Sequence, residues 1–213
     1  MRLDHVSYVA SHDQISDVVN RIGSQIGTAF VDGGIHPKFG TRNFTAPLLN
    51  GQYIEVVCPL DHPATSTTPF GKAVKFKAES GGGWLSWILA TEDISKIEMR
   101  LGRKSTLGYR KKPDGSELNW KQIGVLGTLE DAQLPFFIEW ISNSHPSADG
   151  VAITKITKIE IVGSKDKIAG WTNHTNLDTA LGSCVIEINK NPEEDNGIIS
   201  VEFEIKGQTI SIL

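Results

Sequence analysis

One carboxylate interrupts the apolar and aromatic stretch Leu134-Pro135-Phe136-Phe137-Ile138-Glu139-Trp140-Ile141. Side chains alternate between the two faces of a β-strand. We therefore expect one face to carry Phe137, Glu139 and Ile141, and the other to carry Phe136, Ile138 and Trp140. A carboxylate among apolar neighbours is costly unless it is paired, protonated or bound to a metal. Glu139 is therefore the first candidate functional residue.

The same form occurs in two other places along the chain. Gly51-Gln52-Tyr53-Ile54-Glu55-Val56-Val57 also sets one carboxylate in an apolar strand, and the final Gly207-Gln208-Thr209-Ile210-Ser211-Ile212-Leu213 matches it position for position. Each copy ends a run in which we expect a strand, a helix and then further strands. The sequence therefore predicts three copies of one β-α-β-β-β unit.

The predicted elements follow from periodicity and turn signals. The first copy has expected strands at 3–10, 29–32, 41–49 and 53–57 and a helix at 15–26. The second has strands at 85–90, from 109 onward, at 117–125 and at 135–141, with a helix at 94–101. The third and weaker copy has a strand at 156–162, then a helix that ends near His174, and then strands at 184–189, 198–206 and 208–213.

The repeat predicts an α+β fold. Residues 1–58 and 83–145 are expected to form two paired units. Together with the segment between them they make up the region 1–145, whose curved mixed sheet forms a U-shaped cup. Residues 59–82, rich in Pro, Ser and Thr, are interpreted as a linker with a short helix near 70–76. Residues 150–213 form a degenerate third unit with alternating polar and apolar strands. Its apolar face is expected to pack on its helix, in a structural or interface role.

The repeat also aligns candidate ligands. Its last strands give Glu55, Glu139 and Ser211 at equivalent places, and its first strands give His5, Leu85 and Lys158. One imidazole and two carboxylates around an open position suit a divalent ion such as Zn, Mn, Fe or Ni. In the alternative interpretation, His5 hydrogen-bonds a carboxylate and Glu139 pairs with Arg42 or Arg110, so that the pocket is polar and holds no metal.

Further candidates for substrate binding surround these positions. Arg42 and Asn43 begin a strand, and Arg42 could clamp a carboxylate or phosphate through two hydrogen bonds. Trp87, Trp120 and Phe137 could form apolar walls. The remaining candidates are His36, in a Gly/Pro-rich segment, and Arg110. We interpret His12, His62, His145 and His174 as surface residues in loops or at helix ends.

Composition narrows the range of functions. The chain has 213 residues, of which 39% are hydrophobic and 22% charged, and its net charge is −4. That balance is typical of a globular protein and provides no field that would recruit nucleic acid. An apolar run long enough to span a membrane and a signal-peptide pattern are both absent. The two cysteines, Cys58 and Cys184, are too few for a disulfide scaffold, which favours a reducing cytoplasm.

Taken together, the motifs resemble the glyoxalase-like domain family of the vicinal oxygen chelate superfamily, to which glyoxalases, extradiol dioxygenases and bleomycin-resistance proteins belong. The resemblance covers residues 1 to about 145. It rests on Leu3-Asp4-His5-Val6 with Asp13, Gly33-Gly34-Ile35-His36-Pro37, Gly40-Thr41-Arg42-Asn43, Tyr53-Ile54-Glu55, Trp87-Ile88-Leu89-Ala90-Thr91-Glu92-Asp93, Arg110, Pro113-Asp114-Gly115, Trp120 and Leu134 to Trp140.

The resemblance implies a cup with metal ligands on the first and last strands of each paired unit. His5, Glu55 and Glu139 match three of those ligand positions. The fourth falls on Leu85, or on Trp84 if the register shifts by one residue, and neither side chain is a metal ligand. The chain thus departs from the pattern of the metal-dependent members.

Three functions remain open at the level of sequence, of which a purely structural role leaves Glu139 unexplained. In the first, a metal polarises a substrate with vicinal oxygens and Glu139 is a ligand or the general base, as in a lyase, isomerase or dioxygenase. In the second, the cup binds or sequesters a small molecule without a metal, as bleomycin-resistance proteins do. A small-molecule ligand is expected in both. Edge strands of a cup also invite pairing, so a homodimer is one expected assembly.

Overall fold

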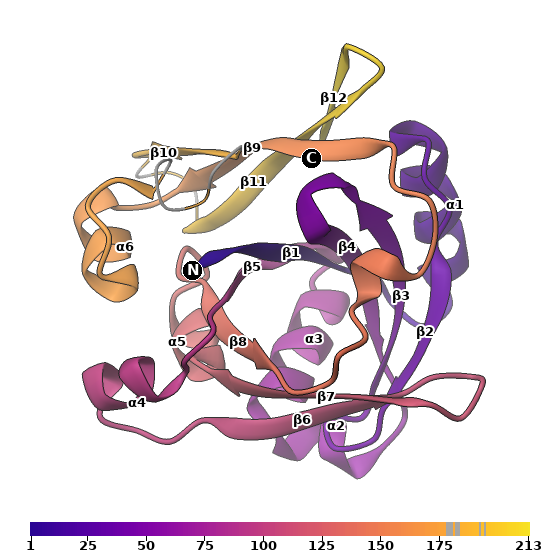
Figure 1. The fold of residues 1–213 in the computed structure, drawn as a ribbon, viewed down its shortest axis with the longest axis horizontal. Helices are drawn as coiled ribbons and strands as arrows, with labels where there is room; N and C mark the ends of the chain where they lie inside the picture. The colour runs from indigo at the N-terminus through magenta and orange to yellow at the C-terminus, as the bar shows by residue number, and fades with distance from the viewer. Residues whose placement is uncertain (178–180, 182–183, 192, 194) are drawn as a thin grey trace.

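The computed structural model describes residues 1–177, 181, 184–191, 193 and 195–213. Its first unit is built as the sequence predicts, with one helix after the first strand and three strands after the helix (Figure 1). The elements are β1 (Arg2–Val9), α1 (Ile15–Ile26), β2 (Val31–His36), β3 (Thr41–Leu48), the short helix η1 (Leu49–Gly51) and β4 (Gln52–Pro59).

The second unit repeats this order with one addition. Its elements are β5 (Gly83–Ala90), α4 (Ser95–Leu101), β6 (Thr106–Lys111), β7 (Glu117–Ile123), α5 (Val125–Glu130) and β8 (Phe136–Trp140). Helix α5 occupies the connection between the last two strands, where the sequence analysis expected no helix. The corresponding connection of the first unit holds only the three-residue η1.

The eight strands form a closed barrel in the order β1-β4-β3-β2-β6-β7-β8-β5. Within each unit the first and last strands are parallel, β1 with β4 and β5 with β8. The units meet through antiparallel pairs, β1 with β5 and β2 with β6, the latter by Ile35 opposite Lys111. The fold class is confirmed, and the predicted cup is closed into a ring by this last pair.

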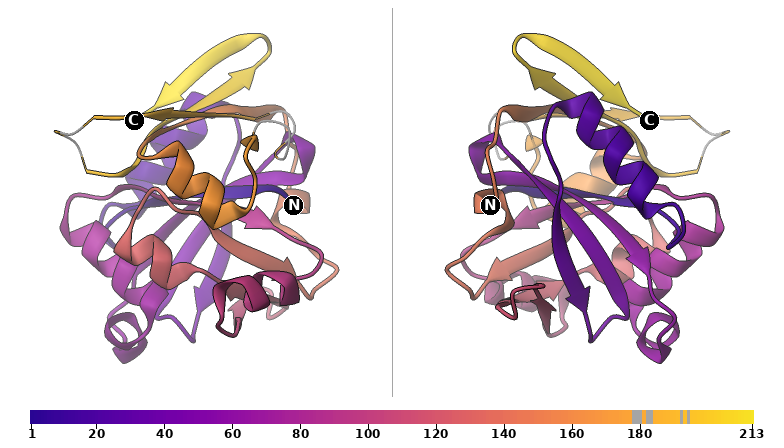
Figure 2. Two further views of the ribbon diagram at one scale, coloured as in Figure 1. Left: turned by 90° about the vertical axis from the view of Figure 1, so that its left-hand side faces the viewer. Right: turned by 90° about the vertical axis from the view of Figure 1, so that its right-hand side faces the viewer.

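Two segments cover the ends of the barrel. The connection predicted as a linker contains α2 (Pro63–Thr67) and α3 (Pro69–Glu79), a longer helix than the sequence indicated. Helix α3 lies inside the ring of strands in Figure 1 and at one edge of the barrel in Figure 2, so it covers one end. The connection after β8, with the short helix η2 (Pro146–Ala148), crosses the other end beside β3 and β4.

Among its described elements, the third unit also runs strand, helix and three strands, namely β9 (Thr154–Val162), α6 (Lys165–Thr172), β10 (Val185–Asn189), β11 (Gly197–Ile205) and β12 (Gln208–Ile212). Its strand order, β10-β9-β11-β12, is different. The first strand β9 pairs in parallel with β10, whereas β1 pairs in parallel with the last strand of its unit. The element order is thus repeated but the pairing is not.

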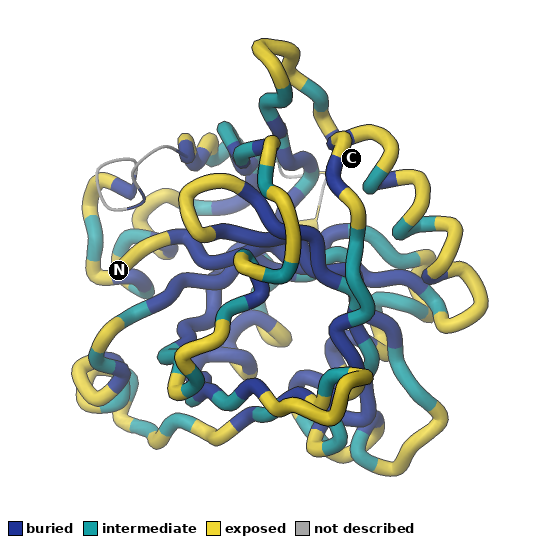
Figure 3. Tube along the Cα trace, turned by 45° about the vertical axis from the view of Figure 1, so that its right-hand side comes forward, coloured by how far each residue is buried: buried dark blue, intermediate teal, exposed yellow. Residues whose placement is uncertain are grey.

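The apolar face of this second sheet packs on the barrel. Ile156, Ile159 and Phe203 are fully buried in the same core as Leu3 and Trp87 of the barrel. The expectation that this face packs on the unit's own helix was therefore incomplete. Figure 3 shows the buried strands, with exposed residues at the turn between β11 and β12. No helix among the described residues is long and apolar enough to cross a membrane.

Candidate functional site

A cavity of about 30 Å³ lies within the barrel, between its two covers. The first unit contributes polar groups to its wall, and the second contributes mainly aromatic and aliphatic groups. The lining residues are His5, His36, Phe39, Asn43, Tyr53, Glu55, Phe70, Arg110, Trp120, Gln122, Phe136, Ile138 and Trp140.

Glu55 is held by two hydrogen bonds at the polar wall. Ser7 Oγ donates to one carboxylate oxygen at 2.5 Å, and Asn43 Nδ2 donates to the other at 2.6 Å. Burial raises the pKa of Glu55, but the charges of His5 and His36 and these two hydrogen bonds outweigh it and lower that pKa below its usual value. Glu55 therefore carries a negative charge at neutral pH.

Arg110 is the least satisfied polar side chain of the cavity. It is only 2% exposed, and its NH1 donates to Asn43 Oδ1 at 3.3 Å. Its Nε and NH2 are buried without a hydrogen-bond partner among the described residues. The nearest carboxylate, Asp149, lies 3.7 Å from NH2. Since a buried N–H without a partner costs free energy, these donors indicate a place for an anionic ligand.

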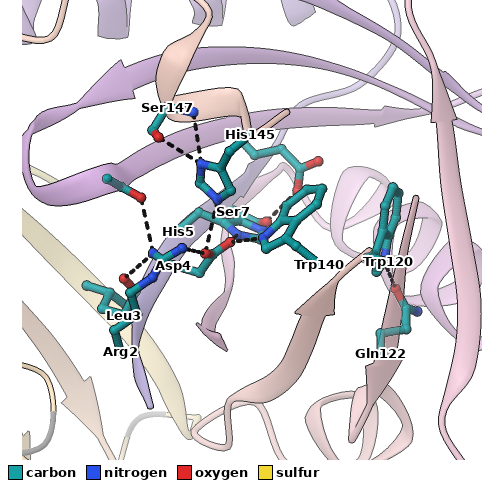
Figure 4. Close-up of polar contacts among 12 residues, drawn as sticks. Arg2, Leu3, Asp4, His5, Ser7, Trp120, Gln122, Trp140, His145 and Ser147 are labelled. Carbon is teal, nitrogen blue, oxygen red and sulfur yellow. Dashed lines mark hydrogen bonds and ion pairs between the residues drawn. The ribbon is translucent and has the colours of Figure 1, made fainter. Parts of the chain in front are cut away.

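The second titratable group of the cavity is His5, which a buried carboxylate orients (Figure 4). His5 Nδ1 lies 3.0 Å from Asp4 Oδ2 and its ring stacks on Tyr53 at 4.2 Å between centroids. Asp4 accepts three further contacts, from Trp140 Nε1 at 3.2 Å, His145 Nε2 at 3.2 Å and Arg2 at 2.9 Å.

These contacts fix the charge of Asp4 and the tautomer of His5. Burial raises the pKa of Asp4, but the hydrogen bonds from His145 and His5 hold it well below its usual value. An ionised Asp4 selects the His5 tautomer that carries a proton on Nδ1. Nε2 is thus the nitrogen of His5 that is available to a ligand in the cavity.

His36 lies in an aromatic part of the wall. Its Nδ1 is 2.9 Å from Thr41 Oγ1, and its ring meets those of Phe39, Phe70 and Trp120 edge to face. Burial lowers the pKa of His36 to about 4, so its imidazole is neutral at pH 7. A neutral imidazole can donate a hydrogen bond to a ligand or accept one from it without adding charge to the cavity.

The cavity contains six of the residues predicted as ligands or substrate contacts, namely His5, His36, Asn43, Glu55, Arg110 and Trp120. The structure places the other four, Arg42, Trp87, Phe137 and Glu139, outside its lining. In β8 the alternation is as predicted, but the face that points inward carries Phe136, Ile138 and Trp140. The prediction that places Glu139 and Phe137 inside the cup is therefore wrong in its choice of face.

Glu139 has two partners on the outside of the barrel. The backbone N–H of Ile94, just before α4, donates to one oxygen at 2.7 Å, and Lys121 Nζ lies 3.0 Å from the other. The carboxylate thus accepts from a backbone N–H that has no partner within the helix, and it forms an ion pair with Lys121 of the neighbouring strand β7. The sequence argument expected a partner for this carboxylate, but it named the wrong ones.

Arg42, Trp87 and Phe137 also face away from the cavity. Arg42 forms an ion pair with Asp32 and lies over the ring of Phe44. Trp87 is fully buried outside the barrel and donates from Nε1 to the carbonyl of Gln133 at 3.0 Å. Phe137 packs in the same outer core. Arg110, rather than Arg42, is therefore the cation available to a ligand.

The predicted three-ligand metal site does not form. Among the described residues, no group of three or more His, Cys, Asp or Glu side chains is placed to hold a metal ion. His5 and Glu55 both reach the cavity, but Glu139 points away and both oxygens of Glu55 already accept hydrogen bonds. Leu85 and Trp84 at the fourth position add no ligand. The donor set does not fit the metal that the resemblance implied.

Several residues of the site escaped the sequence argument. Asp4 precedes His5 directly, and period-2 alternation would put the two on opposite faces. The register between β1 and β5 shifts between Leu3 and His5, and both side chains are buried. His145 was interpreted as a surface residue because it lies in a loop, yet it contacts Asp4 from the segment that covers the barrel. Phe39, Phe70 and Gln122 carried no signal beyond their surroundings, and Tyr53 appeared only within a family motif.

Comparison with known proteins agrees with this architecture. The model of a family described as glyoxalase-like domain matches residues 3–194. No curated protein sequence matches the chain. A hypothetical protein from Staphylococcus aureus has a similar solved structure, with a TM-score of 0.59, 16% identity, and coverage of 99% of this chain and 84% of that one. Methylmalonyl-CoA epimerase from Mycobacterium tuberculosis gives a TM-score of 0.43 at 16% identity, over 65% of this chain and 86% of that one.

The similarity to the staphylococcal structure concerns the fold alone, because the identity is only 16%. The family match is stronger evidence, since it spans both units of the barrel and most of the third unit. It also agrees with the resemblance carried by the motifs around His5, Glu55 and Arg110. The chain belongs to the glyoxalase-like domain family.

Proposed function

We propose that the barrel cavity binds a small 2-oxo acid and that His5 moves a proton at the carbon next to its keto group, without a metal. The observation that carries this proposal is Arg110, which lines the cavity while its Nε and NH2 are buried without a hydrogen-bond partner in the described part of the chain, Asp149 standing 3.7 Å from NH2. A carboxylate is the ligand group that a guanidinium binds best, through two parallel hydrogen bonds.

The neighbouring groups support the choice of a 2-oxo acid. With the carboxylate on Arg110, the adjacent keto oxygen needs a neutral hydrogen-bond partner, and His36 is neutral at pH 7 because burial lowers its pKa to about 4. Asn43 links Arg110 to Glu55 and fixes both side chains. The polar wall thus offers a cation, a neutral donor or acceptor and a base to three neighbouring atoms of one molecule.

Proton transfer is assigned to His5. Its Nε2 removes a proton from C3 of the 2-oxo acid, the electron pair of that C–H bond forms the enolate, and the same nitrogen returns a proton to the carbon. Asp4 keeps Nδ1 protonated throughout. The charge on Glu55 stabilises the imidazolium that forms. The net reaction is exchange or isomerisation, and it needs no other reactant.

Pyruvate is a probe that separates binding from chemistry. Isothermal titration calorimetry of pyruvate should show one site, and Arg110→Gln should weaken it by about 10- to 100-fold, the usual cost of removing a charged hydrogen-bond partner. Arg42→Gln, which changes a guanidinium on the outer face, is the matched control and should leave affinity unchanged.

The chemistry is measured by the loss of the pyruvate methyl signal in D₂O by proton NMR. Wild type should accelerate exchange, His5→Gln should abolish the acceleration while pyruvate still binds, and Glu139→Gln should retain it. Binding that depends on Arg110 without any exchange would instead support the alternative of a metal-free binding or sequestering protein. No effect of Arg110→Gln on affinity would overturn the proposal.

A further inference from the structure

A second cavity of about 140 Å³ adjoins the first at the end of the barrel that α3 covers. It is bounded by the start of α3, the start of β6 and the connection from β7 into α5, and its lining is mainly apolar. The lining residues are Lys38, Phe39, Thr68, Pro69, Phe70, Arg103, Lys104, Thr106, Gln122, Ile123, Gly124, Val125 and Leu126.

Three side chains separate the two cavities. Phe39, Phe70 and Gln122 line both of them. The two phenyl rings meet edge to face at 5.6 Å between centroids, and they belong to the loop after β2 and to the first turn of α3. The two rings thus form part of the separation, and a change of their side-chain rotamers would widen the connection between the two spaces.

Neither cavity alone suits an organic acid with a bulky tail. The first, of about 30 Å³, contains Arg110 but is so small that only the carboxylate and keto end of such an acid fits against it. The second is close to the ~150 Å³ of an apolar cavity that accepts a benzene ring. Its lining contains no carboxylate among the described residues, and it includes the cations Lys38, Arg103 and Lys104, of which Lys104 pairs with Glu98. Apart from these cations the lining is mostly apolar, which suits an apolar tail rather than a second charged group.

We propose that the two cavities form one elongated site, in which a 2-oxo acid places its carboxylate on Arg110 and an aryl or branched apolar tail in the second cavity. Phe39 and Phe70 form the gate between the two parts. This inference rests on the proposed function, because the head of the ligand is assigned by Arg110. It adds that the natural ligand carries a bulky apolar tail.

The test compares two probes, pyruvate and 2-oxo-4-phenylbutanoate, by isothermal titration calorimetry. Thr106→Trp fills the second cavity from an exposed position at the start of β6. Leu107→Trp, one residue along and outside the lining, is the matched control. Wild type should bind the phenyl probe about 10- to 100-fold more tightly than pyruvate, as burial of a ring implies.

Thr106→Trp should remove that preference and leave pyruvate affinity unchanged, whereas Leu107→Trp should alter neither. A preference for the phenyl probe that survives Thr106→Trp would overturn the elongated site, and so would equal affinity of wild type for both probes. The proposed function fails separately, if Arg110→Gln leaves the affinity for both probes unchanged or if neither probe binds wild type. Circular dichroism of each variant checks that it is folded.

Discussion

Gly33 makes room for the polar wall of the cavity. A Cβ atom at this position would lie 2.2 Å from Asn43 Oδ1 and 2.6 Å from Arg110 NH1. These are the two atoms that form the hydrogen bond between Asn43 and Arg110. Gly33 belongs to one of the motifs that carry the family resemblance. The structure gives a physical reason for a glycine here, because the side chains of Asn43 and Arg110 occupy the space that any larger side chain would need.

Gly33→Ala should therefore destabilise the protein by about 1–3 kcal/mol, the usual cost of overpacking a buried site. Gly170→Ala, in α6 where a Cβ would meet no atom within 4 Å, should be neutral or slightly stabilising. Urea denaturation followed by circular dichroism measures both. A stable Gly33→Ala variant with normal pyruvate affinity would show that Asn43 and Arg110 can move aside at little cost.

His36 makes stability depend on pH. Burial lowers its pKa from 6.5 to about 4, so between these values the unfolded chain binds more protons than the folded one. Stability is therefore lost as pH falls from 6.5 to 4, by about 3 kcal/mol from this residue. His36→Gln should show a shallower loss over that interval when unfolding free energies are compared at pH 4.5 and 7. Equal slopes for the two proteins would mean that folding does not lower the pKa of His36.

The donor set also leads to a prediction about metals. Because Glu139 points away from His5 and Glu55, we expect no stoichiometric binding of Zn²⁺, Mn²⁺ or Ni²⁺ in the cavity and no thermal shift that depends on His5. Differential scanning fluorimetry with each ion, for wild type and His5→Ala, measures this. A stabilisation by one ion that disappears in His5→Ala would contradict it, and would call for a ligand set other than the predicted three.

At the scale of elements, β8 shows what periodicity can and cannot establish. Alternation correctly separated Glu139 and Phe137 from Phe136, Ile138 and Trp140. It could not say which set faces inward, because both faces of this strand are covered. The interior takes Phe136 and Ile138 against α3, while Phe137 packs outside near α6. A carboxylate in such a strand can therefore accept a hydrogen bond from a helix start outside the barrel as readily as it can face a ligand inside.

Glu139 should therefore matter for α4 and not for the ligand. Glu139→Ala removes the acceptor for the Ile94 N–H and the partner of Lys121, and should cost about 0.5–2 kcal/mol of stability, as loss of a helix cap does. Pyruvate affinity should stay within twofold of wild type. Lys121→Met, which removes only the ion pair, should cost less than 1 kcal/mol. A large loss of affinity in Glu139→Ala would restore Glu139 to the site.

At the scale of the whole molecule, the repeat predicted the barrel better than it predicted the third unit. The first two units pair their first and last strands, so a β-α-β-β-β order translates directly into a half-barrel. In the third unit the same order gives another sheet, because β9 pairs with β10 and β11 instead. Element order is encoded by local periodicity, whereas strand pairing depends on contacts with the rest of the chain, here with the outer side of β5 and with α1.

The barrel and the second sheet share one core, which predicts a single unfolding transition. Phe203 and Val201 of β11 are fully buried in the cluster that contains Trp87 and Leu89 of β5, and Trp84 Nε1 donates to the Ile212 carbonyl at 3.0 Å. Far-ultraviolet circular dichroism and tryptophan fluorescence should therefore give coincident urea transitions.

Removal of the Phe203 ring tests the size of this coupling. Phe203→Ala should lower the free energy of unfolding of the whole protein by about 3–5 kcal/mol, because it leaves a cavity between the two sheets that neither can close alone. Phe76→Ala is the matched control on α3, where the ring is 69% exposed, and should have little effect. If Phe203→Ala instead split the curve, with fluorescence of the barrel unchanged while part of the circular dichroism was lost, the second sheet would be a separate folding unit.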